Sequence, residues 1–138
     1  MRATLIIMTA VAAVACSDSF KPTEENVVGD YTLQMLMTTD TSGTRDWVAA
    51  GATLTLTLDT NGTTTGHLHV PGAGVGGGDF DADMAGTWSL TGSTVTFDQT
   101  ADTFMRDMDF TAGKNRLSGD QTFSSSTNPE RVRIAMTK

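Results

Sequence analysis

The stretch ATLTLTLDTNGTTTGHLHV, residues 52–70, decides the fold class. Leucines alternate with threonines over residues 53–58, which predicts a strand with one buried face and one solvent-exposed face. Asn61-Gly62 follows, and both residue types accept the positive φ that a tight turn needs. Apolar and polar residues then alternate again over residues 63–70. We therefore expect an antiparallel β-hairpin here.

The same two-residue period recurs along most of the chain and predicts about eight strands with short links. The further alternating segments are 31–37, 80–90, 95–97, 104–110, 117–123 and 132–136. Gly86 is expected to mark a bend or bulge within a long strand. No segment shows a helical period. The prediction is an all-β, antiparallel up-and-down barrel, because closure removes exposed sheet edges. A two-sheet β-sandwich is the alternative.

Two irregular stretches, residues 38–51 and 71–78, interrupt these strands. If they lie at one mouth of a barrel, that mouth is where a functional site is expected, because scaffold loops commonly carry function.

Length and charge restrict the classes of function. The 138 residues suffice for one domain, and the formal net charge is −7 at pH 7. An acidic surface repels phosphate backbones, so we expect no nucleic-acid partner. The charge favours solubility or cationic partners without identifying a protein partner.

The first residues have the pattern of a leader that is removed from the mature chain. Arg2 precedes a 13-residue apolar stretch, ATLIIMTAVAAVA, which is too short to span a bilayer and has the size of a signal-peptide core. We expect a signal peptide over residues 1–15, a polar tether over 16–26 and a β-barrel domain over 27–138. The tether begins SDSFKPTEEN after Cys16, a composition typical of a flexible linker.

Cys16 is the single cysteine of the chain, so it has no intramolecular disulfide partner. Ala13-Val14-Ala15-Cys16 resembles the bacterial lipobox, in which the cysteine becomes the first mature residue and carries acyl chains. That resemblance implies lipid attachment at Cys16, and two or more acyl chains hold a protein stably on a membrane. Because Ser17 rather than Asp follows, the resemblance implies an outer-membrane location in the bacterial cell envelope. Ordinary signal cleavage after Ala15, leaving a free Cys16, is the alternative.

Two segments, VVGDYTLQ (27–34) and MAGTWSLTGSTVTF (84–97), carry a second resemblance. Their Gly-x-aromatic-x-Leu pattern is similar to strands of small bacterial lipocalin-like lipoproteins, although Tyr31 stands where lipocalins proper carry tryptophan. The resemblance implies an eight-stranded antiparallel barrel, sometimes with an internal apolar cavity. It implies no catalytic residues.

The predicted interior is rich in methionine, which suits an adaptable apolar pocket. An ordinary filled core is the alternative, because an eight-stranded barrel is just wide enough for its own side chains. Arg106 shares the inward parity, and a one-residue bulge is expected to turn it to solvent. The candidate cavity residues are Tyr31, Met35, Met37, Met84, Trp88, Phe97, Met108, Phe110 and Met136, with Phe80 and Phe104 on the same predicted face.

His67 and His69 lie on the outward face of their strand, where two imidazoles at this spacing can share a metal ion. Asp79, Asp81 and Asp83 can supply the remaining ligands if their strand lies alongside, which a hairpin through residues 71–78 favours. A solvated strand face is the alternative. We expect no resident cofactor or metal.

No G-x-S-x-G, H-E-x-x-H or P-loop motif is present, so we expect no enzyme. Three functional hypotheses remain. The first is an envelope lipoprotein whose barrel binds a small apolar ligand. The second is a structural or protein-interaction lipoprotein with a filled core. The third is a protein with a surface metal site at His67 and His69.

Overall fold

The computed structural model describes residues 19–124 and 129–138. One short helix, one 3₁₀ turn and ten strands make up its regular structure. These elements are α1 (Glu24–Val27), β1 (Gly29–Asp40), β2 (Gly43–Asp46), β3 (Thr53–Leu58), β4 (Thr63–Val70), η1 (Val75–Gly77), β5 (Phe80–Asp83), β6 (Gly86–Thr91), β7 (Thr94–Gln99), β8 (Phe110–Gly113), β9 (Arg116–Phe123) and β10 (Glu130–Thr137). Among the residues described, no helix is long and apolar enough to cross a bilayer.

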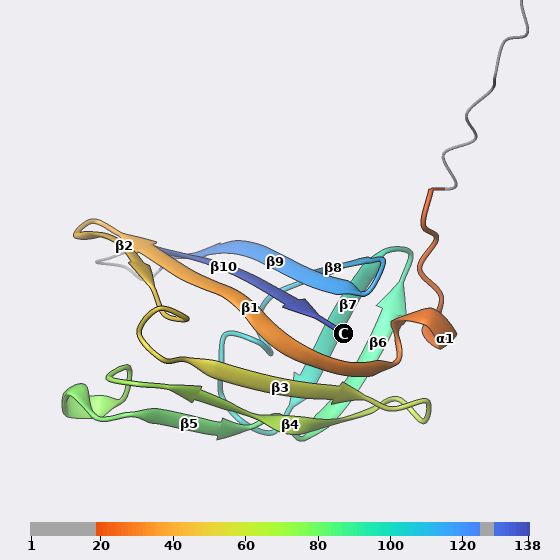
Figure 1. Cartoon of the computed structure of the whole chain (residues 1–138), viewed down its shortest axis with the longest axis horizontal. Helices are drawn as coiled ribbons and strands as arrows, with labels where there is room; N and C mark the ends of the chain where they lie inside the picture. Colours follow the sequence, from red (N-terminus) through yellow and green to blue (C-terminus); the bar gives the residue numbers. More distant parts are fainter. Residues whose placement is uncertain (1–18, 125–128) are drawn as a thin grey trace, which may run out of the picture.

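Eight of the strands close into an antiparallel barrel (Figure 1). The order around it is β1-β3-β4-β6-β7-β8-β9-β10, and pairing of β10 with β1 completes the circle. The two remaining strands are appendages: β2 pairs with the far half of β1, and β5 pairs with the far half of β4. The predicted barrel is confirmed, and the sandwich alternative is not the architecture observed.

The hairpin of residues 52–70 has the predicted form. Leu54, Leu56 and Leu58 are buried, and the turn between β3 and β4 is closed by Gly62, whose φ is +83°. Its amide donates to the Asp59 carbonyl at 3.0 Å. The alternation therefore translates directly into a buried leucine row facing the barrel interior.

The predicted inward face of β1 is wrong beyond Leu33. Pairing with β10 slips by one residue between Leu33 and Met35, and this β-bulge reverses the faces of the residues that follow. Leu36 is buried in consequence, whereas Met35 and Met37 are only partly buried. Met35 lines a groove with charged side chains of β9 and β10 instead of the interior.

Two further segments differ from the predicted strands. The expected long strand over residues 80–90 breaks just before Gly86 and becomes β5 and β6. Residues 104–109 form a turn-rich loop rather than a strand, and β8 begins only at Phe110. This loop sends Met105 into the core with no exposed surface, against the predicted parity. The irregular stretch 38–51 is also partly regular, since it contains the end of β1 and all of β2.

The middle of the barrel is filled by side chains. Phe97 and Phe110 meet edge to face with their ring centres 5.1 Å apart. Large side chains from every quarter of the barrel are fully buried around them, including Met84, Met105, Leu117, Ile134 and Met136. The packing matches the expectation that eight strands enclose just enough space for side chains.

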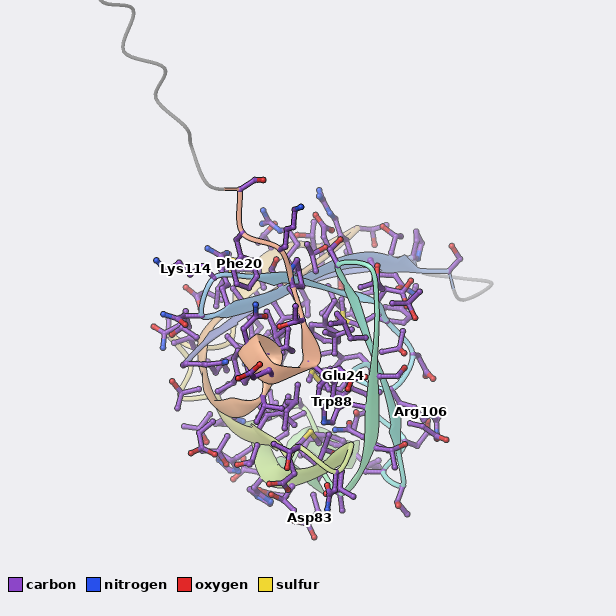
Figure 2. The ribbon with its side chains drawn as sticks, turned by 90° about the vertical axis from the view of Figure 1, so that its right-hand side faces the viewer. Phe20, Glu24, Asp83, Trp88, Arg106 and Lys114 are labelled. Atoms are coloured by element: carbon purple, nitrogen blue, oxygen red, sulfur yellow. The ribbon has the colours of Figure 1, made fainter. Side chains whose placement is uncertain are left out.

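One end of the barrel is closed by the residues before β1. Thr23 caps the N-terminus of α1, and Val27 at its end is buried. The Tyr31 hydroxyl donates a hydrogen bond to the Val27 carbonyl, with the two oxygens 2.6 Å apart. Lys138 donates to the carbonyls of Asn26 and Val28, each at 2.6 Å, and thus ties the last residue to the first turn. Figure 2 looks at this end, with Glu24 of α1 lying across it and Trp88 within the barrel outline. Burial raises the pKa of Tyr31 to about 12, so its hydroxyl stays a donor.

The last residues of the predicted tether therefore belong to the folded domain, because α1 starts at Glu24. The predicted signal peptide and Cys16 lie outside the described residues.

Gly66 generates a prediction about stability. Its φ is +138°, and an added Cβ would lie 2.0 Å from the Thr55 carbonyl oxygen on the neighbouring strand. We expect Gly66→Ala to lower the free energy of unfolding by about 3 kcal/mol, because backbone strain and a backbone clash add. Urea denaturation measures the loss.

Gly43→Ala is the matched control. Gly43 has a similar φ of +134° but nothing within 4 Å of an added Cβ, so strain alone should cost about 1 kcal/mol. Equal losses in the two variants would contradict the close approach of β3 and β4 as the reason for Gly66.

Candidate functional site

The end of the barrel opposite α1, which carries β2 (Figure 1), is its open end. A cavity of about 560 Å³ lies there. Its larger apolar lining residues come from six separate parts of the chain and include Leu36, Trp47, Phe80, Phe104, Phe123 and Val132. Leu36 and Val132 are inward residues of β1 and β10, so the floor of the cavity is the top of the filled core. This volume lies within the range typical of small-molecule sites.

The irregular segments build the walls, as expected for a barrel mouth. Trp47 follows β2, and its indole Nε1 donates to the Thr38 hydroxyl at 2.9 Å. Arg45 stacks over the Trp47 ring at 3.8 Å from the ring centre. The 71–79 segment contributes Ala73, and Gly72 is held by a hydrogen bond from its amide to the Asp79 carboxylate at 3.1 Å. The loops predicted to carry function thus do border the cavity.

The loop between β7 and β8 forms another wall. Phe104 and Thr103 line the cavity from this loop, while Met105 next to them is buried in the core and fixes the loop in place. Arg106 lies on the loop and bonds to the carboxylates of Asp102 and Asp107. Its predicted orientation away from the interior is therefore correct, although a loop rather than a bulged strand produces it. The guanidinium's pKa is raised by its hydrogen bond to Asp107 and by the charge of Asp102.

The nine sequence-predicted cavity residues lie elsewhere. Seven of them form the filled core: Tyr31, Met84, Trp88, Phe97, Met108, Phe110 and Met136 are all buried. Met35 and Met37 follow the β1 bulge and are partly exposed. None of the nine is among the residues that line the mouth cavity in the described part of the chain.

Several lining residues had no signal in the sequence pattern. Trp47 and Thr103 lie in segments without periodicity, so alternation could not assign them a side. Phe80 and Phe104 are on the predicted inward face, but Phe80 starts β5 and Phe104 lies on the β7–β8 loop, so both are at the mouth rather than in the centre. Phe123, the last residue of β9, is at the mouth for the same reason as Phe80.

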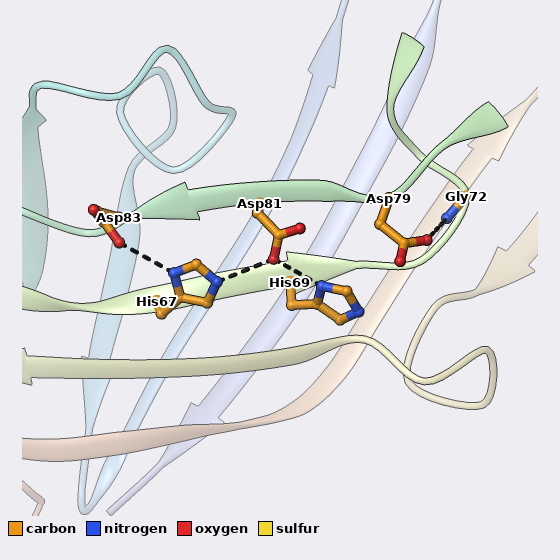
Figure 3. Close-up of polar contacts among 6 residues, drawn as sticks. All are labelled: His67, His69, Gly72, Asp79, Asp81 and Asp83. Carbon is orange, nitrogen blue, oxygen red and sulfur yellow. Dashed lines mark hydrogen bonds and ion pairs between the residues drawn. The ribbon is translucent and has the colours of Figure 1, made fainter. Parts of the chain in front are cut away.

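The two histidines lie on the outward face of β4, as predicted, and Figure 3 shows them beside the aspartates of β5. β4 and β5 pair so that His67 lies opposite Asp83 and His69 lies opposite Asp81. His67 Nδ1 is 3.1 Å from Asp83 Oδ1, and His67 Nε2 is 3.0 Å from Asp81 Oδ1. His69 Nδ1 is 2.8 Å from the same Asp81 oxygen. The predicted adjacency of the two strands is confirmed.

This arrangement favours a proton over a metal ion on His67. A carboxylate only accepts hydrogen bonds, so His67 bonds to both carboxylates at once only in its protonated, imidazolium form. Hydrogen bonds to Asp83 and then Asp81 raise its pKa, and the two histidines lower the pKa of Asp81. Within residues 19–124 and 129–138, no three His, Cys, Asp or Glu side chains converge as a metal site would require.

Comparisons of the chain with protein-family models, with curated proteins and with solved structures found no match.

The His67 interactions predict how stability depends on pH. Because the folded pKa is raised above the ordinary 6.5, this stabilisation is complete below pH 6.5 and is lost as pH rises through the folded pKa. We expect the melting temperature of the wild type to fall more between pH 6 and pH 9 than that of His67→Ala. Thermal unfolding followed by circular dichroism measures both slopes.

Asp83→Asn tests the assigned cause, since it keeps the imidazole and removes its first carboxylate partner. An NMR titration should then give His67 a lower pKa than in the wild type. An unchanged pKa, or an unchanged slope in His67→Ala, would contradict the charged bridge.

Proposed function

We propose that this chain is a non-enzymatic, lipocalin-like lipoprotein of the bacterial cell envelope that binds a small apolar ligand at its open end. The observation that carries the proposal is the mouth cavity of about 560 Å³ lined by aromatic and aliphatic side chains. The closed eight-stranded barrel supports it, because such scaffolds hold ligands in their mouths.

The filled centre determines where a ligand would sit. The side chains of Met84, Met105 and Ile134 are fully buried and fill the middle of the barrel. The ligand of the proposal is therefore a small molecule held above this core, with Trp47 and Phe104 against its sides. The same filled core supports the second hypothesis, a structural lipoprotein that acts through a protein partner.

The position of α1, the first element of the described chain, supports the membrane-anchor part of the proposal. α1 lies at the closed end of the barrel, and β2 lies at the opposite end (Figure 1). The cavity is lined by Trp47, just after β2, and opens at that opposite end. An acylated Cys16, eight residues before the start of α1 at Glu24, would hold the closed end nearer to the membrane. The cavity would then open away from the lipid surface, where it could exchange ligand with the aqueous phase.

Binding of a neutral apolar probe tests the proposal. We expect 1-decanol to change the fluorescence of Trp47, which lines the cavity, and Trp47→Phe to remove that change. Phe123→Gln should weaken decanol binding about fivefold to tenfold, because it removes most of one aromatic contact area.

Leu33→Gln is the matched control, since Leu33 is a partly buried apolar residue of β1 that does not line the cavity. Its decanol affinity should equal that of the wild type. Absence of saturable decanol binding by the wild type would refute the ligand-binding function and favour the filled-core alternative.

The anchor has a separate test in the full-length precursor expressed in a bacterium. We expect the wild type to fractionate with membranes and Cys16→Ser to be released, because two or more acyl chains give stable attachment. Mass spectrometry of the mature N-terminal peptide should show the acyl chains on Cys16. A Cys16→Ser variant that stays in the membrane fraction would contradict the lipid anchor.

A further inference from the structure

We propose that the ligand of the mouth cavity carries a positive charge: an apolar chain or ring system bearing an ammonium group. This inference rests on the proposed function and adds the chemical class of the ligand's polar end. It follows from the charges at the cavity wall, from one unpaired buried hydroxyl and from the aromatic wall.

The charged residues that line the cavity are all acidic. Asp102 and Asp107 lie on the β7–β8 loop and Glu130 starts β10, while no lysine, arginine or histidine of the described residues is part of the lining. Asp102 and Asp107 share one guanidinium, that of Arg106, so the loop retains a net negative charge. Glu130 is exposed and has no ion pair within residues 19–124 and 129–138. A cationic group entering the mouth would therefore meet attraction, and a carboxylate would meet repulsion.

A second observation points to a ligand independently of charge. Thr103 is 5% exposed and lines the cavity, and its hydroxyl oxygen has no hydrogen-bond partner among the described residues. A buried hydroxyl without a partner is costly, and the Thr103 oxygen has almost no accessible surface. A ligand that bonds to it once the side chain turns toward the cavity recovers that cost. An ammonium group carries three N–H donors, enough for this oxygen and for a carboxylate together.

The aromatic wall is compatible with a cation. Arg45 already lies over the Trp47 ring at 3.8 Å from its centre, so the ring face attracts positive charge. Arg45 does not line the cavity itself but borders the neighbouring hollow with Glu130. The guanidinium of Arg45 is the group through which the mouth would attract an anion instead of a cation. The experiment therefore includes the variant Arg45→Ala.

Three ligands with the same ten-carbon chain separate the effect of the head group. Decylammonium, 1-decanol and decanoate are titrated at pH 7 against the wild-type domain, below their critical micelle concentrations, with Trp47 fluorescence as the signal. We expect decylammonium to bind about tenfold more tightly than decanol and decanoate to bind most weakly. Added NaCl should weaken decylammonium binding and leave decanol binding unchanged.

A pair of charge-neutralising variants locates the attraction. Glu130→Gln should weaken decylammonium binding about threefold and leave decanol binding unchanged, because one exposed carboxylate is worth little more than this. Glu25→Gln removes the same charge from α1 at the closed end and should change neither affinity. Equal losses in both variants would show an effect of overall charge and overturn the assignment to the mouth.

Thr103→Val tests the hydroxyl with a side chain of the same shape. The variant should melt at the same temperature as the wild type or higher, because it removes an unpaired buried polar group. Its decylammonium affinity should nevertheless fall about threefold. Unchanged affinity would remove Thr103 from the proposed site.

The outcomes distinguish this inference from the function beneath it. If decanol binds and decylammonium binds no more tightly, the cationic ligand is refuted while the apolar site stands. If decanoate binds best and Arg45→Ala abolishes that preference, the site takes anions and the inference is wrong. If none of the three ligands saturates, the proposed function itself fails.

Discussion

Pairing of β10 with β1 is the constraint on which the rest of the structure depends. It joins the last strand to the first and converts an open meander into a closed barrel. The two strands fit only with a bulge between Leu33 and Met35, which turns the second half of β1 over and puts Leu36 inside. Closure also removes the free edges of the eight barrel strands, which would otherwise invite association with other chains. Lys138 extends the same seam past β10, where its ammonium group holds the carbonyls of Asn26 and Val28.

Closure makes the two ends of the barrel physically different. At one end, α1, Val27 and the Tyr31 hydroxyl seal the interior with hydrogen bonds and apolar contacts. At the other end, β1 pairs with the appended strand β2 in place of β3, and β4 pairs with the appended strand β5 in place of β6. The segments next to these appended strands form one wall above the filled core, and the loop that carries Thr103 and Met105 forms another. The cavity is therefore a property of strand ends and loops, while the barrel centre supplies rigidity.

The outer face of β4 and β5 carries the side-chain contacts that join β5 to β4 beside the cavity. β5 is off the path of the barrel and pairs with β4, so its attachment depends on that ladder and on the side chains across it. His67 bridges Asp81 and Asp83 of β5 from β4, and His69 adds a second bond to Asp81. These contacts accompany the backbone pairing of β4 with β5. That pairing places Phe80 at the cavity. The carboxylate partners of His67 therefore lie on the same short strand as Phe80, which lines the cavity.

The sequence by itself determined the all-β class, the β3–β4 hairpin and the neighbouring positions of His67 and Asp83. These features follow from local rules: a two-residue period assigns the faces of Leu54 and Leu56, and Asn61-Gly62 permits the turn between strands. Only the tertiary structure decided that Met35 points away from the interior, that Met105 fills the core and that Trp47 lines a cavity. A bulge is set by the fit of β1 against a strand about a hundred residues later, and a loop without periodicity takes its direction from the space left by the closed barrel. Local alternation carries no information about the fit of β1 against a distant strand or about the space left for a loop. The sequence therefore located the interior, and closure of the barrel decided which part of it stays open.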